Sequence, residues 1–443
     1  MATDSILLRA LVDTVQPLTE DSPDLDALVE RLSSAQFVLL GEASHGTHEF
    51  YELRAAISRR LLGDYGFAAI AAEADWPDAH RVNRFIRHEG HDRDVKTALS
   101  DFQRFPQWMW RNSDVVNLVT WMRTYNRDSD TPVGFYGLDM YSLHSSINAV
   151  IDYLAERDEN AAIAARARYA CFDTLALQPD RYGMLAARGL REDCADEVVA
   201  QLIDLQKRRE QLLKEGGTAS ADQLFAAEQN ARVVAHAEEY YRAMYRGQVS
   251  TWNLRDTHMM ETLDALSNHL GRNGKPGKII VWAHNSHVGD AEATEREFRG
   301  EINLGQLCRQ RHPKTTKLVG FTTHHGSVTA ASDWGAAAER KIVRPALTSS
   351  YEHLFHDTGI PRFVLHLDQL GEAAGALHEP RLHRAIGVVY RPQTERESHY
   401  YHSSLPSQFD AIIHVDESSA LLPLERSAEW DRGELPDTYP SGL

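Results

Sequence analysis

Eight short apolar runs recur along the chain of 443 residues, and each is closed or followed by a glycine, a polar or a charged residue. The runs are five to seven residues long and rich in valine, isoleucine and phenylalanine, which is typical of strands buried on both faces of a sheet. They are QFVLLG (36–41), FAAIAAE (67–73), VGFYGL (133–138), KIIVWAH (278–284), KLVGF (317–321), FVLHL (363–367), IGVVY (386–390) and FDAIIH (409–414). This pattern predicts a sheet with helices on both faces.

The segment between the first two runs has a helical pattern. Phe50, Leu53, Ile57 and Leu61 recur there at the spacing of one helix face. A strand, a helix and a second strand in succession indicate a parallel βαβ unit. We therefore expect an α/β fold with a mainly parallel central sheet flanked by helices.

The region 143–260 breaks this rhythm, because it contains helical patterns and no convincing strand. We expect a helical insertion that forms a smaller subdomain, within an α/β core of residues 1–142 and 261–425. Apolar residues repeat at helical spacing on both sides of EGGTAS, which predicts an antiparallel helical hairpin turning near Gly216 and Gly217. Residues 426–443 have prolines and charges without periodicity, so we expect an extended C-terminal tail.

The charge of the chain argues against a nucleic-acid partner. Lys and Arg number 47 against 64 Asp and Glu, which gives a formal charge of -17 that would repel phosphate backbones. No apolar run approaches the roughly 20 residues that span a bilayer, so no membrane partner is expected. The N-terminus has Asp4 before its apolar stretch and no basic leader, so no signal peptide is expected either.

The cysteines are few and scattered. Cys171, Cys194 and Cys308 are too sparse for a disulfide framework or a cysteine-rich zinc site, so buried thiols are expected. These features together predict a soluble, cytoplasmic protein, and they leave the oligomeric state open.

Ionisable residues stand at the ends of four of the predicted strands. In open parallel sheets the ligand crevice lies outside the carboxyl ends of the strands, so these side chains are expected to converge. They are Glu42 and His45 after the first run, Glu73 at the end of the second, Asp139 after the third, and His284 and His287 at and after the end of the fourth.

The segment GEASHGTHEF contains the candidate general base. A neutral imidazole can take a proton from water near neutral pH, and a neighbouring carboxylate orients it. We assign these roles to His45 and Glu42, in a turn that Gly41 and Gly46 permit. His48 is given no catalytic role.

Glu73 follows an apolar run, where a carboxylate is costly to bury without a partner. Arg54, on the predicted helix after His45, is the expected cation. Such a pair could be a structural ion pair or a clamp on the substrate, and the sequence leaves both open.

His284 and His287 could donate hydrogen bonds to an oxyanion or could ligate a metal. Together with Glu42 and His45 they supply enough ligands for zinc, but H-E-x-x-H is absent. We favour a site without metal or cofactor, and a metal-dependent hydrolase on the same histidines stays as the alternative. Serine-nucleophile, phosphate-loop and dinucleotide motifs are also absent.

Several segments resemble the erythromycin esterase family, which includes proteins labelled as succinoglycan biosynthesis proteins. The resemblance implies an α/β core with a helical elaboration, hydrolytic opening of a macrolide lactone, and His45 as the water-activating base. It places the catalytic group on Glu42, His45, Arg54, Glu73, His284 and His287. The segments are GEASHGTHEFYELR, EADWPDAHRVNRF, FPQWMWRN, FYGLDMYSL, LRDTHMM, VWAHNSHVGD, NLGQLCR and QFDAIIHVDES.

The expected partner is a small ester or macrolide, held against aromatic side chains. Trp76, Trp110 and Tyr141, with Asp139 beside them, are the candidate binding residues, although aromatic residues at this density also suit a core. The alternative to an enzyme is a non-catalytic carbohydrate- or polyketide-binding protein linked to polysaccharide biosynthesis.

Overall fold

The computed structural model describes residues 2–19, 23–175, 184–186, 193–245, 248–371 and 374–433. The chain divides into two compact units, the first made of Met1–Ile70, Phe85–Gly134 and Lys278–Leu443, the second of Ala71–Arg84 and Phe135–Gly277. None of the described helices combines the length and the apolar content that crossing a bilayer would require.

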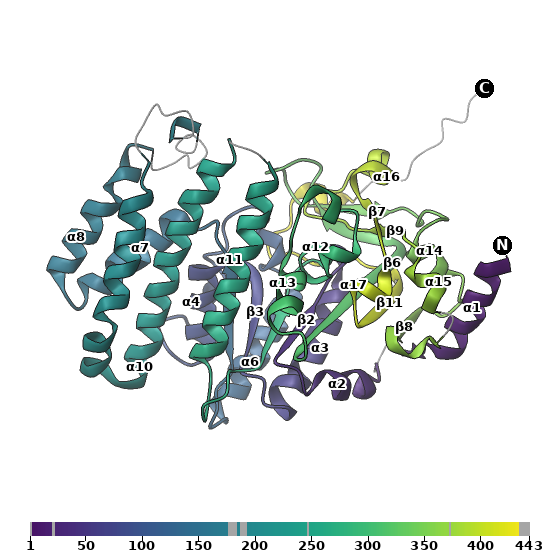
Figure 1. Cartoon of the computed structure of the whole chain (residues 1–443), viewed down its shortest axis with the longest axis horizontal. Helices are drawn as coiled ribbons and strands as arrows, with labels where there is room; N and C mark the ends of the chain where they lie inside the picture. Colours follow the sequence, from purple (N-terminus) through teal and green to yellow (C-terminus); the bar gives the residue numbers. More distant parts are fainter. Residues whose placement is uncertain are drawn as a thin grey trace. The chain divides into compact units, whose positions relative to one another are not determined.

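The first unit contains most of the strands (Figure 1). Its elements are α1 (Ala2–Thr14), β1 (Gln16–Pro17), α2 (Asp26–Leu32), β2 (Phe37–Leu40), α3 (His48–Asp64), α5 (Val95–Ala98), α6 (Ser113–Arg127), β5 (Ile279–Trp282), α12 (Asn285–Val288), α13 (Leu304–Arg311), β6 (Thr316–Ala330), β7 (Glu339–Val343), α14 (Tyr351–His356), β8 (Arg362–His366), α15 (Ala374–His378), β9 (Arg381–Arg384), α16 (Glu395–Ser398), β10 (Tyr400–Ser403), α17 (Leu405–Gln408), β11 (Ala411–Ser418) and α18 (Ala428–Arg432).

The remaining elements belong wholly or mostly to the second unit. They are β3 (Ala69–Asp75), α4 (Trp76–Ile86), β4 (Gly134–Asp139), α7 (Leu143–Ala155), α8 (Glu159–Tyr169), α10 (Ala195–Ala243) and α11 (Gln248–His269). Helices α7, α8 and α10 pack around a common apolar core, and α11 packs against α10. The second unit therefore contains the whole of 143–260 together with residues on both sides of it.

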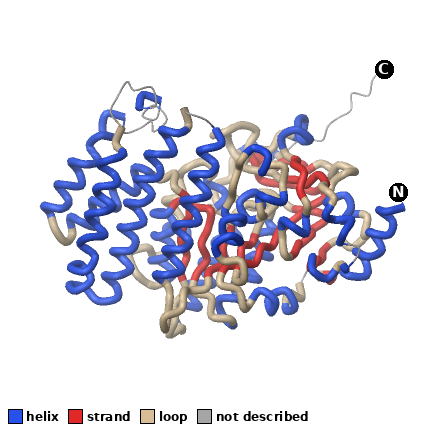
Figure 2. The backbone as a smooth tube through the Cα atoms, viewed as in Figure 1, coloured by secondary structure: helices blue, strands red, loops and turns tan. Residues whose placement is uncertain are grey.

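Nine strands form a mainly parallel sheet in the order β1-β8-β11-β6-β2-β5-β3-β4, with β7 beside β6, and a two-stranded sheet of β9 and β10 is separate. Strand β2 runs parallel to both β5 and β6, and β11 runs parallel to β6. Phe37–Leu40 are fully buried, as expected for a parallel strand covered on both faces. Figure 2 distinguishes the strands, in red, from the helices, in blue. The predicted α/β class is confirmed.

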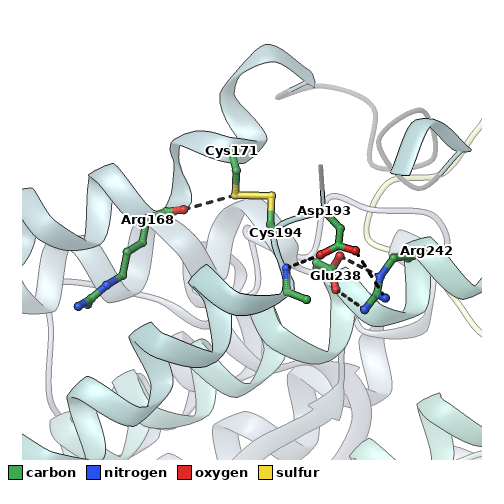
Figure 3. The surroundings of a disulfide bond; sticks show 7 residues. Arg168, Cys171, Asp193, Cys194, Glu238 and Arg242 are labelled. Atoms are coloured by element: carbon green, nitrogen blue, oxygen red, sulfur yellow. Dashed lines mark hydrogen bonds and ion pairs between the residues drawn. A yellow bond between two sulfur atoms is a disulfide. The ribbon is translucent and has the colours of Figure 1, made fainter. Parts of the chain in front are cut away.

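The predicted hairpin in the second unit is also confirmed. Helical geometry is assigned throughout Ala195–Ala243, yet Asp193 Oδ2 lies 3.8 Å from Arg242 Nη1 (Figure 3). A straight helix of this length would separate its ends by about 70 Å, at about 1.5 Å per residue. The chain between Asp193 and Arg242 therefore folds back on itself, which confirms the hairpin but not its turn at Gly216 and Gly217, where helical geometry is assigned. The side chains of residues 209–220 lie outside the described part of the chain.

The expectation of three thiols is wrong for two of the cysteines. Cys171 and Cys194 form a disulfide, 23 residues apart in sequence with Cα atoms 6.0 Å apart (Figure 3). The fold brings the start of α10 back beside Cys171, a proximity that cysteine spacing alone does not reveal. Cys308 is a buried thiol, as expected. This pair therefore does not support the prediction of a cytoplasmic protein.

Two further predictions of local structure need correction. The run IGVVY (386–390) is not a strand, because Ile386 and Val389 form only isolated bridges with Ser44 and Ala331. Part of the predicted tail is ordered, since the buried Trp430 of α18 donates from Nε1 to Thr329 Oγ1 at 2.8 Å. Residues 434–443 of that tail lie outside the described residues.

Candidate active site

The loop of residues 41–47 joins β2 to α3 and is closely packed at its two glycines. A Cβ atom at Gly41 would lie 2.1 Å from Asn285 Oδ1, and one at Gly46 would lie 1.9 Å from the Thr329 carbonyl oxygen. Any side chain at either position would clash. Both glycines are therefore required by packing, and the loop presents its polar side chains from a rigid frame.

His45 and Glu42, both from this loop, form a hydrogen-bonded pair. His45 Nδ1 lies 2.9 Å from Glu42 Oε1, and both residues are buried. A carboxylate only accepts hydrogen bonds, so Nδ1 carries the proton and the lone pair of the neutral ring is on Nε2. This is the tautomer that a general base requires.

Arg54 donates from Nη2 to Glu42 Oε2 at 2.5 Å, so Glu42 serves the base and the guanidinium at once. The Arg54 Cζ atom lies 4.5 Å from the ring centroids of both Tyr51 and Trp282, and the residue is 1% exposed. Its Nε and Nη1 groups have no hydrogen-bond partner in the described part of the chain. Cation–π contacts stabilise the buried charge and leave these in-plane donors available.

His284 stands at the end of β5 and packs against His45, with ring centroids 4.8 Å apart. Its Nδ1 accepts a hydrogen bond from the backbone N–H of Ser286 at 3.2 Å. A backbone N–H can only donate, so the neutral His284 ring carries its proton on Nε2 and can donate from there. His287 is buried on the short helix α12, three residues further along.

The prediction that Glu73 pairs with Arg54 is wrong, because the cation beside Glu73 is another arginine. Glu73 Oε1 accepts from Arg255 Nη2 at 2.8 Å, and the same guanidinium donates to both carboxylate oxygens of Asp139 at 3.0 and 2.6 Å. Arg255 was missed by the sequence reasoning. A usable signal was present, because two buried strand-end carboxylates require a cation, and Arg255 lies in the helix α11 segment LRDTHMM.

The four candidate binding residues do not form one wall that is open to a substrate. Trp76 is 1% exposed and stacks on Tyr136 at 5.7 Å, so it belongs to the core and not to a wall open to a substrate. Tyr141 lies under the guanidinium of Arg255, and its hydroxyl contacts that of Tyr240 at 3.2 Å. Asp139 is occupied by the ion pair described above, and Trp110 is buried.

A cavity of about 470 Å³ lies in the first unit and is lined partly by aromatic residues. Phe105 and Trp108 contribute to its wall together with Pro423. Two residues before Pro423, the Leu421 backbone N–H donates to the Gly46 carbonyl at 2.9 Å. Residues 421–423 therefore connect the loop that carries His45 to the wall of this cavity.

His48 is a surface group rather than part of the cluster. Its Nδ1 lies 2.9 Å from Asp114 Oδ2, and its side chain is 41% exposed. The hydrogen bond to Asp114 raises the pKa of His48 to about 9, against the opposing effect of partial burial.

This raised pKa predicts that the stability difference between the wild type and a variant without His48 depends on pH. A raised folded-state pKa stabilises the fold below the unfolded value near 6.5, and the contribution is lost as pH rises through about 9. We expect His48→Gln to lower the Tm near pH 6 and to match the wild type near pH 10. Asp114→Asn should remove the same pH dependence, and high salt should weaken it. A Tm difference independent of pH would contradict the assignment.

Comparison with known proteins adds to this geometry. A model of the erythromycin esterase family matches residues 63–418, which is most of the chain. The chain belongs to the erythromycin esterase family. Erythromycin esterase type II of Escherichia coli is 20% identical over 414 residues, covering 89% of this chain and 93% of the relative. Membership supports a hydrolase of the esterase kind.

Solved structures of similar proteins support the erythromycin esterase fold. A crystal structure of a succinoglycan biosynthesis protein has a TM-score of 0.78 and 20% identity, covering 95% of this chain and 99% of that one. A mutant erythromycin esterase in its open conformation has a TM-score of 0.64 and 18% identity, covering 92% and 97%. The family model begins after Glu42, His45 and Arg54 and includes Glu73, His284 and His287.

Proposed function

We propose that this erythromycin esterase family member hydrolyses a carboxylic ester or macrolactone, with His45 as the general base. The observation that carries the proposal is the 2.9 Å contact between His45 Nδ1 and Glu42 Oε1. It places the unprotonated nitrogen of the neutral ring on the side away from the carboxylate, where a water molecule can be activated.

The proposed reaction proceeds by direct attack of water. His45 Nε2 takes a proton as the water oxygen bonds to the ester carbonyl carbon, and an oxyanion forms. His284 Nε2–H and the available N–H groups of Arg54 are the proposed donors to that oxyanion. The imidazolium then protonates the departing alkoxide, so an acid and an alcohol are released and His45 returns to its neutral form.

The tautomer of His284 supports this scheme over a metal-dependent one on the same histidines. Metal ligation through Nε2 would require the proton on Nδ1, where the Ser286 backbone N–H already donates. His284 is therefore assigned as a donor. His287 keeps the place in the catalytic group that the family resemblance implies.

The proposed substrate is a hydrophobic ester or a macrolide whose apolar part lies against an aromatic wall. The cavity lined by Phe105 and Trp108 is the described candidate for this wall. We place Trp110, which is buried, in the packing of the first unit, and Tyr141 with Asp139 forms part of the Arg255 cluster in the second unit.

The test is a mass-spectrometric screen of macrolides and simple esters for products heavier by one water. Wild-type protein should convert at least one compound, and His45→Gln, which offers no base at neutral pH, should convert the same compound far more slowly. If the protein is a non-catalytic binding protein, compounds should bind to it and remain intact. Conversion at equal rates by both proteins would reject His45 as the base.

A further inference from the structure

A second concentration of histidines lies apart from the His45 loop, on three other elements of the first unit. Strand β6, helix α14 and strand β11 all contribute, although they are far apart in the sequence. The residues are His324 and His325 on β6, His353 and His356 on α14, and His414 and Asp416 on β11. The proposed hydrolysis uses none of them.

The strand register explains why His324 and Asp416 meet. In the parallel pairing of β6 with β11, Val415 lies opposite Thr323 and Glu417 lies opposite His325. His324 and Asp416 stand between these pairs, so their side chains project from the same face of neighbouring strands.

Helix α14 brings further imidazoles to this face. His353 and His356 are three residues apart and so share one side of the helix. Their ring centroids lie 5.8 and 3.8 Å from that of His324. His324 is buried, whereas the His356 side chain is 41% exposed and gives the group access to solvent.

We propose that His324, His356 and Asp416 form a binding site for a divalent transition-metal ion such as Zn²⁺. One ligand atom from each residue lies within 4.8 Å of the other two. Two imidazoles and one carboxylate are donors that Zn²⁺ and its neighbours in the first transition row prefer, and water can complete the coordination.

The surrounding groups indicate which nitrogen of each histidine an ion would take. His324 Nδ1 lies 3.0 Å from His325 Nδ1, so Nε2 is the nitrogen that His324 offers. His356 Nδ1 lies 2.9 and 3.0 Å from the two carboxylate oxygens of Asp416, so a bound ion would take the place of this hydrogen bond, with His356 Nδ1 and an Asp416 oxygen as ligands. His414 Nε2 lies 3.4 Å from Asp416 Oδ1. Outer partners of this kind orient metal ligands.

Binding requires one small rearrangement. The rings of His324 and His356 are stacked, with planes 6° apart, and two parallel rings cannot both point a lone pair at one ion. His356 is the last residue of α14 and is partly exposed, so it is the ring that turns. A bound ion then ties α14 to β6 and β11. If added metal changes the stability or the activity of the protein, this site offers an explanation that does not involve the histidines around His45.

The test is calorimetric titration of ZnCl₂ into the untagged, chelator-treated full chain. We expect the wild type to bind one equivalent, and His356→Ala and Asp416→Asn to bind at least about 10- to 100-fold more weakly, the loss that removal of even an outer partner causes. His45→Ala, in the proposed catalytic loop, and His402→Ala, at an exposed contact with Glu295, should bind like the wild type.

A second readout identifies the ligands. Co²⁺ added to the wild type should produce visible absorption bands of a histidine-coordinated ion, and these should be absent in His356→Ala. Because His356 is partly exposed, this variant is expected to keep the wild-type circular dichroism spectrum, and it decides the question if Asp416→Asn does not fold. Equal binding by wild type and His356→Ala, no binding by the wild type, or loss of binding in His45→Ala would overturn the site.

Discussion

His45→Ala is expected to lower kcat by about 100- to 10,000-fold on any ester that the wild type hydrolyses, because the variant loses a positioned general base. The fold should persist, since His45 lies in a loop whose backbone is held at Gly46 by the N–H groups of Thr329 and Leu421. The measurement is steady-state kinetics, with circular dichroism to check folding.

His48→Ala is the matched control for this variant. It removes an imidazole three residues further along, where the side chain pairs with Asp114 and does not contact the Glu42–His45 pair among the described interactions. Near wild-type turnover is expected. A folded His45→Ala protein with unchanged kcat, or equal losses in both variants, would remove His45 from the mechanism.

Arg54→Met should destabilise the protein by about 3–5 kcal/mol, because it leaves the buried Glu42 carboxylate without its guanidinium. Methionine keeps apolar volume against Tyr51 and Trp282, so lost charge pairing dominates over a cavity. Urea denaturation measures the free energy of unfolding.

The double variant Arg54→Met/Glu42→Gln provides the control. Glutamine removes the unpaired charge, so the double variant should be more stable than Arg54→Met alone. Its loss of stability should therefore be clearly smaller than the sum of the losses in the two single variants. Strictly additive losses would show that the ion pair contributes nothing beyond its two parts. Arg60→Met, which removes an exposed guanidinium from the same helix, should cost far less.

The partners of the charged residues show where sequence reasoning reaches its limit. Strand-end position predicted Glu42, His45 and His284, because chain direction alone brings such residues to one edge of a parallel sheet. It assigned Arg54 to Glu73, whereas Arg54 contacts Glu42 and Arg255 contacts Glu73. Arg255 is 182 residues from Glu73 in sequence, and no local periodicity encodes that pairing.

The aromatic residues and the cysteines illustrate the same limit. From the sequence Trp76 suits a binding wall or a core, and its burial and its stacking on Tyr136 place it in the core. Cys171 and Cys194 are too few to suggest a framework, and their Cα separation of 6.0 Å comes from the return of the chain at the start of α10.

The sequence by itself determined the α/β class, seven of the eight predicted strands, the return of the chain between Asp193 and Arg242, and the loop that carries His45. These depend on local signals, namely apolar periodicity, strand length and glycine placement. Only the tertiary structure decided the tautomers of His45 and His284, the partners of the buried charges and the meeting of His324 with His356 and Asp416. Those features depend on distances between atoms that the chain brings together from separate elements, and such distances exist only once the strands have paired and the helices have packed.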